Sequence, residues 1–242
     1  MPHSADSAQC VVVLGMHRSG TSMLAGSLEC AGLYLGDISS AARFNKKGNK
    51  ENSDIRAQND RILARAGATW GQPPPLQAPW SQEDRDDATE LVRSYIDVNR
   101  PWGFKDPRTV WTLQGWLDIL PNPTIVAVVR HPALVAKSLT ARAGSLRLSY
   151  EAGLSLWAAY NTEILRLVRL LQFPVLHFSS GKDPMLWKKL EQICQDIGLA
   201  ASPRAFYAAG LVNQREVTAV PDAVSALYKE LCGLAQTPLR EG

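Results

Sequence analysis

The feature that most constrains the fold is a short apolar run that leads directly into a glycine-bounded loop. The run, Cys10–Leu14 (CVVVL), is apolar at every position, as strands buried on both faces of a parallel sheet are. A loop from Gly15 to Gly20 follows, and then Thr21–Cys30, which carries apolar residues at helical spacing. The order strand, loop, helix predicts the first unit of an α/β fold with a parallel sheet.

The rest of the chain repeats this alternation. Further strands are predicted at Trp102–Lys105, Thr124–Val129 and Pro174–Phe178. Helices are predicted at Ser53–Gly67, Ser81–Val98, Thr109–Leu120, from Pro132 onward, at Tyr150–Leu171 and at Pro184–Ile197. Three consecutive prolines within Gln72–Pro79 exclude regular structure there. We therefore expect one α/β domain over residues 1–242, with a P-loop-like parallel sheet flanked by helices on both faces. Residues 1–9 are expected to be flexible and residues 200–242 to form a helical tail.

Composition excludes several classes of protein. With 45% hydrophobic residues and a net charge of +3, the chain of 242 residues is not disordered as a whole. Its longest apolar runs are far shorter than the ~20 residues of a membrane span, and no secretory signal is visible. The sequence has no dense basic stripe, so a nucleic-acid partner is not expected. The cysteines show no C-x-x-C spacing and are predicted to be reduced, buried thiols of a cytoplasmic protein: Cys10, Cys30, Cys194 and Cys232. The four histidines lack the paired spacing of a zinc site, so no metal is expected.

The loop after the first strand keeps the frame of a P-loop, Gly15-x-x-x-x-Gly20-Thr21-Ser22. Two glycines let the backbone curl so that its N–H groups point at an anion, at the start of a helix whose dipole favours negative charge. The triphosphate-binding version has a lysine after the second glycine, where this chain has Thr21. Positive charge lies instead at Arg18. The loop therefore predicts phosphate binding, and the missing lysine argues against ATP or GTP hydrolysis.

A second anion site is predicted at the end of the strand Thr124–Val129. Arg130 follows this strand at the edge where open parallel sheets bind their ligands. Ser138 comes two helical turns later, so a guanidinium and a hydroxyl could hold one phosphate at two points. The two sites together are more specific than either one alone.

These motifs carry a resemblance to a known family. Gly15–Ser22 (GMHRSGTS) with Arg130–Ser138 (RHPALVAKS) resembles the two signatures of sulfotransferases that use 3′-phosphoadenosine 5′-phosphosulfate, PAPS. Gly103–Arg108 (GFKDPR) and Asn45–Asn52 (NKKGNKEN) are similar to segments of bacterial members, and the resemblance extends over about Cys10–Leu171. It implies transfer of a sulfuryl group from PAPS to a hydroxyl, or less readily an amine, of a small-molecule or carbohydrate acceptor. The desulfonated nucleotide, PAP, would be released.

The resemblance also implies which residues bind the donor. In the family, the first motif holds the 5′-phosphosulfate and the second holds the 3′-phosphate. The expected donor-binding residues are Gly15, His17, Arg18, Ser19, Gly20, Thr21, Ser22, Arg130 and Ser138. Arg18 could offset charge on the departing phosphate. No magnesium is expected, because the donor carries less charge than a triphosphate.

Two further residues are candidates for the chemistry. The family places a carboxylate base after its first strand–helix unit, which implies that role for Glu51, although Glu51 could equally belong to a solvated polar loop. Lys105 ends a predicted strand, with Asp106 and Arg108 beside it. These charges could bind donor or acceptor anions, or they could form a structural ion pair that caps the next helix. Both interpretations stay open.

Several aromatic residues and histidines have plainer interpretations. Trp111 and Trp116 are predicted to lie in the core, whereas Trp70 and Trp80 flank the proline-rich loop and could line an acceptor cleft. His131 is predicted to cap a helix.

Two other functions remain open from the sequence. One is a nucleotide or sugar kinase with a degenerate P-loop, which would need the missing lysine and a magnesium-binding carboxylate. The other is a non-catalytic protein that binds PAPS or PAP, which would keep Arg18 and Arg130 but would not need Glu51.

Overall fold

The computed structural model describes residues 9–38, 48–96, 98–141, 148–179, 183–206 and 218–239. Most of the terminus predicted to be flexible, residues 1–8, and Asn45, Lys46 and Lys47 of the polar loop lie outside these ranges.

One parallel sheet organises the described chain. Its strands are β1 (Cys10–Leu14), β2 (Trp102–Lys105), β3 (Thr124–Val129) and β4 (Val175–His177), in the order β2-β1-β3-β4. All three pairings are parallel, and Val12 lies between Phe104 and Ile125 in the register. The predicted parallel α/β sheet is thus confirmed, and β4 is one residue shorter at each end than expected.

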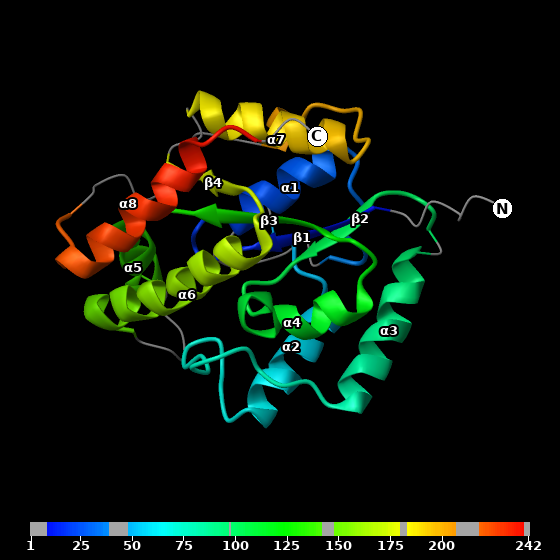
Figure 1. Ribbon diagram of the computed structural model, residues 1–242, viewed down its shortest axis with the longest axis horizontal. Helices are drawn as coiled ribbons and strands as arrows, with labels where there is room; N and C mark the ends of the chain where they lie inside the picture. Colours follow the sequence, from blue (N-terminus) through cyan, green and yellow to red (C-terminus); the bar gives the residue numbers. More distant parts are fainter. Residues whose placement is uncertain are drawn as a thin grey trace.

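Helices cover both faces of this sheet (Figure 1). The α-helices are α1 (Thr21–Ala31), α2 (Ser53–Arg65), α3 (Gln82–Ile96), α4 (Thr109–Ile119), α5 (Pro132–Thr140), α6 (Tyr150–Leu171), α7 (Pro184–Asp196) and α8 (Asp222–Gln236), with one 3-10 turn, η1 (Pro203–Phe206). In Figure 1, α1 and α7 lie on one face and α4 and α6 on the other.

The alternation of side chains along β1 divides the core between the two faces. Val11 and Val13 pack with residues of α1 and α7, whereas Val12 and Leu14 pack with residues of α2, α4 and α6. Successive side chains of a strand point to opposite faces, so a strand covered on both sides must be apolar throughout. This explains the unbroken apolar run from which the fold was predicted.

Two helix starts carry side-chain caps. Ser81 Oγ accepts a hydrogen bond from the Asp84 N–H (3.1 Å), and Asp84 Oδ2 accepts one from the Ser81 N–H (2.9 Å). This is a capping box in which aspartate takes the usual place of glutamate. At α5, His131 Nδ1 accepts from the Ala133 N–H (3.2 Å), and Pro132 occupies the first turn. The predicted capping role of His131 is confirmed.

The tryptophans correct one prediction. Trp111 and Trp116 are buried, as expected. Trp80 does not line the cavity described below, because it packs edge-on against Trp116 and donates from Nε1 to the Thr112 carbonyl (3.1 Å). Gly115 makes room for it, since a Cβ there would lie 2.1 Å from the Trp80 ring. Trp80 therefore belongs to the packing around α4.

The burial of the cysteines differs from the prediction at two positions. All four cysteines are free thiols, but Cys30 is exposed and Cys232 only half-buried, so the prediction that all are buried is wrong for these two.

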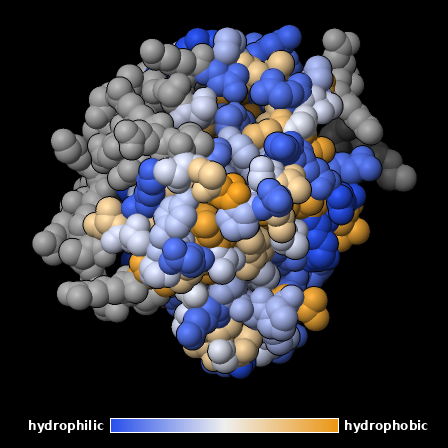
Figure 2. All heavy atoms as spheres, turned by 90° about the vertical axis from the view of Figure 1, so that its left-hand side faces the viewer, coloured by the Kyte–Doolittle hydropathy of each residue, from blue (hydrophilic) through white to orange (hydrophobic). Residues whose placement is uncertain are grey.

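Figure 2 shows the face at the left of Figure 1, where hydrophilic residues surround small groups of hydrophobic ones. Among the helices of the described residues, none combines the length and apolar character that crossing a bilayer requires.

Candidate active site

The loop between β1 and α1 has a backbone that only glycine fits at two positions. Gly15 has φ +150°, and a Cβ there would lie 2.7 Å from a Thr21 methyl carbon and 2.8 Å from the Val128 carbonyl oxygen. Gly20 has φ +101°, and its Cβ would meet the Phe178 ring at 2.8 Å. Gly20 is also the N-cap of α1, so no side chain caps the first turn of that helix. The first amides of α1 are therefore available to an anion.

The two predicted anion motifs meet at Arg18. Its Nε donates to Ser138 Oγ (2.8 Å), and Nη1 of Arg130 donates to the Arg18 carbonyl (3.2 Å). Arg18 itself has φ +69°, a conformation that non-glycine residues seldom adopt. Burial lowers the pKa of Arg130. Motifs more than a hundred residues apart in sequence thus form one cationic cluster, in which a bound anion would offset the cost of burying Arg130.

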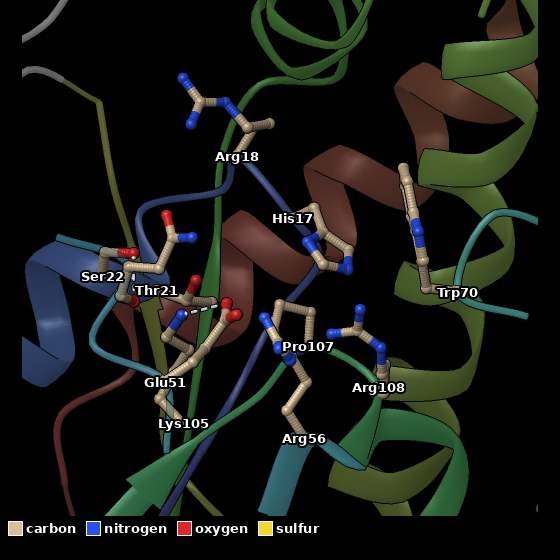
Figure 3. Close-up of a pocket in the computed structure, with 11 residues that line it drawn as sticks. His17, Arg18, Thr21, Ser22, Glu51, Arg56, Trp70, Lys105, Pro107 and Arg108 are labelled. Carbon is tan, nitrogen blue, oxygen red and sulfur yellow. Dashed lines mark hydrogen bonds and ion pairs between the residues drawn. The ribbon is translucent and has the colours of Figure 1, made fainter. Parts of the chain in front are cut away.

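A cavity of ≈ 180 Å³ opens beside this loop (Figure 3). It is lined by His17, Arg18, Thr21, Ser22, Asn49, Glu51, Arg56, Trp70, Lys105, Pro107 and Arg108. Six residues predicted to bind the donor or act in catalysis are therefore brought together. The other predicted residues, Gly15, Ser19, Gly20, Arg130 and Ser138, do not line it. Ser19 is fully buried. Its N–H donates to the Met16 carbonyl (3.2 Å), a hydrogen bond within the loop between β1 and α1.

Glu51 and Lys105 form an ion pair at the wall of the cavity. Lys105 Nζ, at the end of β2, lies 2.6 Å from Glu51 Oε1. The lysine side chain is 1% exposed and the glutamate side chain 14%. Burial lowers the pKa of Lys105, and the Glu51 carboxylate opposes that change. Asn52 holds Glu51 at the head of α2, because its side chain caps that helix by accepting from the Asp54 and Ile55 N–H groups.

Of the two interpretations of the charges next to Lys105, the structural one holds for Asp106 and Arg108, which form an ion pair at the start of α4. Asp106 Oδ1 accepts from the Arg108 N–H (3.1 Å) and from Arg108 Nη1 (3.0 Å), just before α4 begins. Arg108 Nε also lies 2.5 Å from Asp60 Oδ1. Burial alone would lower the pKa of Arg108, but the two carboxylates outweigh it and raise that pKa. Lys105 does not take part in this cap.

An aromatic wall closes another side of the cavity. The Trp70 ring lies 4.6 Å from the His17 ring, centroid to centroid, with the planes tilted by 54°. The Tyr160 hydroxyl donates to the Trp70 carbonyl (2.9 Å) and so ties this segment to α6. Trp70 therefore lies at the cavity, as the sequence suggested, whereas Trp80 does not.

Three lining residues were not predicted: Asn49, Arg56 and Pro107. The Asn49 carbonyl accepts from Ser22 Oγ (2.9 Å), which joins the loop before α2 to the first helix. For Arg56 the sequence does hold a signal. It lies at the end of the first turn of the predicted helix that follows Glu51, close to the positive end of the helix dipole, where a cation does not favour the helix.

The fold and the loop define a class: an α/β protein with a P-loop-like anion site at the edge of a parallel sheet. Residues 10–174 match the Sulfotransferase family, and the chain belongs to that family. It is therefore an enzyme of the transferase class. Among the described residues, no three His, Cys, Asp or Glu side chains gather as metal ligands would.

The fold also occurs in a solved structure, the sulfotransferase domain of the olefin synthase of Synechococcus PCC 7002. The TM-score is 0.56 at 16% sequence identity, with 99% of this chain and 98% of that chain covered. No curated protein sequence matches the chain.

Proposed function

We propose that this sulfotransferase uses PAPS as its donor and a hydroxyl, or less readily an amine, of a small-molecule or carbohydrate as its acceptor. The observation that carries the proposal is the junction of the two motifs, in which Arg18 bonds Ser138 and Arg130 bonds the Arg18 carbonyl. A nucleotide with phosphate groups at both the 5′ and 3′ positions needs two such neighbouring anion sites. The family membership favours this use over the kinase alternative.

The donor's two ends would be held by different groups. The amides at the start of α1, with Arg18, Thr21 and Ser22, would face the 5′-phosphosulfate, since these side chains line the cavity. Arg130 and Ser138 would face the 3′-phosphate. A guanidinium can bind a phosphate through two parallel N–H groups, which fixes orientation as well as charge.

The reaction would be an in-line displacement at sulfur. The acceptor oxygen forms a bond to sulfur while the bond between sulfur and the bridging oxygen of the 5′-phosphate breaks, and PAP leaves with that oxygen. Negative charge grows on the leaving phosphate, and Arg18 and Lys105 would offset it. The proton of the acceptor hydroxyl would pass to Glu51.

The ion pair between Glu51 and Lys105 supports these roles. Lys105 is anchored at the end of β2 and almost fully buried, so it holds the Glu51 carboxylate at the cavity wall. Among the described residues, Lys105 is the hydrogen-bond partner of Glu51, through Oε1. The second carboxylate oxygen, Oε2, could then accept the acceptor's proton.

The test is to incubate the protein with PAPS and a panel of hydroxylated compounds and to search for sulfated products by mass spectrometry. We expect a product heavier by one sulfuryl group, and PAP in equal amount. Arg130→Ala should lower its formation, whereas Arg61→Gln, an exposed arginine of α2 outside the cavity, should not. Phosphorylated products with ATP and magnesium, and no sulfated ones, would support the kinase. Tight PAP binding without transfer to any acceptor would support the non-catalytic protein.

A further inference from the structure

The cavity holds more positive charge than its own carboxylates neutralise. Four cations line it, Arg18, Arg56, Lys105 and Arg108, against the single carboxylate of Glu51. Lys105 is paired with Glu51, and Arg108 lies against Asp106 and Asp60. Arg18 bonds Ser138 and would serve the donor. Arg56 is exposed, and no carboxylate among the described residues forms an ion pair with it.

The position of Arg56 links it to the candidate base. Asn52, the N-cap of α2, separates Glu51 on one side from the first helical turn, which ends at Arg56, on the other. The same cap therefore fixes where both side chains start. In Figure 3, Arg56 rises from α2 between Glu51 and Arg108, on the side of the cavity toward His17 and Trp70. A cation this close to the positive end of the helix dipole does not stabilise the helix, so helix stability does not account for an arginine at this position.

Trp70 gives the same region a flat apolar surface. It is half-buried, and its backbone is held by the Tyr160 hydroxyl. Indole faces suit the apolar faces of aromatic rings and of other planar groups, and they lose little entropy on binding because the side chain has only two torsions. An acceptor lying against Trp70 would have Glu51 and Arg56 within the same cavity.

We propose that Arg56 and Trp70 form an acceptor subsite for a hydroxylated compound that carries a separate anionic group, a carboxylate or a sulfate. The inference rests on the proposed function, because it assigns Glu51 and the loop to the reacting hydroxyl and the donor. Arg56 binds the anionic group, since a guanidinium pairs with either anion through parallel hydrogen bonds. Trp70 packs against the carbon skeleton. Arg56 thus determines which acceptors bind, and Trp70 determines how tightly they bind.

The experiment measures acceptor binding to the PAP-loaded protein by calorimetry, with matched pairs as probes. One pair is 4-hydroxyphenylacetate and its methyl ester, the second is methyl glucuronide and methyl glucoside, and the third is 4-hydroxybenzenesulfonate and phenol. Within each pair only one member carries the anionic group. The pairs distinguish carboxylate from sulfonate, a stand-in for sulfate, and an aromatic skeleton from a sugar. The variants are Arg56→Gln, Trp70→Leu and the control Arg61→Gln, which removes an arginine of the same helix from outside the cavity.

We expect the wild type to prefer the anionic member of at least one pair by about tenfold or more. Arg56→Gln should abolish that preference, while Trp70→Leu should weaken both members equally and Arg61→Gln should change neither. Equal affinities within every pair, or a preference that survives in Arg56→Gln, would overturn the inference, as would no binding of any anionic member. PAP binding is measured first in each variant. Failure of the wild type to bind PAP would refute the proposed function itself, a result distinct from PAP binding without acceptor preference.

Discussion

Glu51→Gln separates a catalytic carboxylate from a merely structural one. The substitution keeps the shape of the side chain and a hydrogen-bond acceptor for Lys105, but it removes the charge. General-base help is worth about 10²–10⁴-fold in rate, so turnover should fall by about two orders of magnitude or more. PAP affinity should stay within a small factor, because the loop and Arg130 are untouched.

The same substitution also has a cost in stability that the structure allows us to estimate. Lys105 is 1% exposed, and the Glu51 carboxylate 2.6 Å away is its ion-pair partner. Removing one partner of a buried pair typically costs about 3–5 kcal/mol. Because Glu51 is 14% exposed and glutamine still accepts a hydrogen bond, we expect the lower end, about 3 kcal/mol. The pKa of Lys105, already lowered by burial, should fall further.

A double variant tests the stability effect by itself. Glu51→Gln combined with Lys105→Met removes the uncompensated charge, so it should be at least about 1 kcal/mol more stable in urea than Glu51→Gln alone. Its turnover should stay low, because it lacks both the base and the charge of Lys105, so the role of Glu51 in turnover is judged from Glu51→Gln alone, assayed where that variant is folded. The matched control is Glu29→Gln, which breaks an ion pair of the same length, 2.6 Å, between Glu29 and Lys50 next to the site. That control should keep turnover near the wild-type value. If Glu51→Gln never lost turnover, Glu51 would not be the base.

Three further predictions follow from the loop, its neighbours and the sheet edge. In calorimetry, Arg130→Ala should lower the affinity for PAP by about tenfold more than the affinity for adenosine 5′-phosphate, because only PAP carries the 3′-phosphate. Ser138→Ala should have the same effect, but a smaller one. If Arg130→Ala lowered both affinities equally, the role of Arg130 would be purely structural. Gly20→Ala should destabilise the protein in urea by about 1–3 kcal/mol, since φ is +101° and the new Cβ meets the Phe178 ring at 2.8 Å; an unchanged midpoint would contradict the loop geometry. Burial lowers the pKa of His177 and, together with the neighbouring His177, that of His131. The unfolded chain then binds more protons below about pH 6.5, so the free energy of unfolding should fall as the pH drops from 7.5 to 5.5, and replacing both histidines by glutamine should flatten this slope.

The sequence was sufficient to predict the sheet because a strand that is buried on both faces is apolar at nearly every position. Cys10–Leu14 and Thr124–Val129 are almost wholly apolar and lie side by side in the parallel sheet. The loop between β1 and α1 could be predicted equally well, because the positive φ and the close neighbours of Gly15 and Gly20 exclude other residues at both positions. In such cases one local requirement dictates the residue type.

Contacts between distant segments could not be predicted in this way. Nothing local in the sequence shows that Lys105 pairs with Glu51 or that Arg18 reaches Ser138, because the packing of α2 and α5 around the sheet decides both. The place of Trp80 beside the proline-rich loop groups it with Trp70, but Gly115 on α4 leaves a space that takes the Trp80 ring. An alternation of apolar residues does not reveal such a space.

The central claim is that the two joined motifs bind a nucleotide with 5′ and 3′ phosphate groups rather than a triphosphate. Thermal unfolding with PAP, and separately with ATP and magnesium, tests it most directly. PAP at ~100 times its dissociation constant should add about 2.7 kcal/mol to the free energy of unfolding and raise the melting temperature, while ATP with magnesium should scarcely change it. A larger shift with ATP and magnesium than with PAP would contradict the claim.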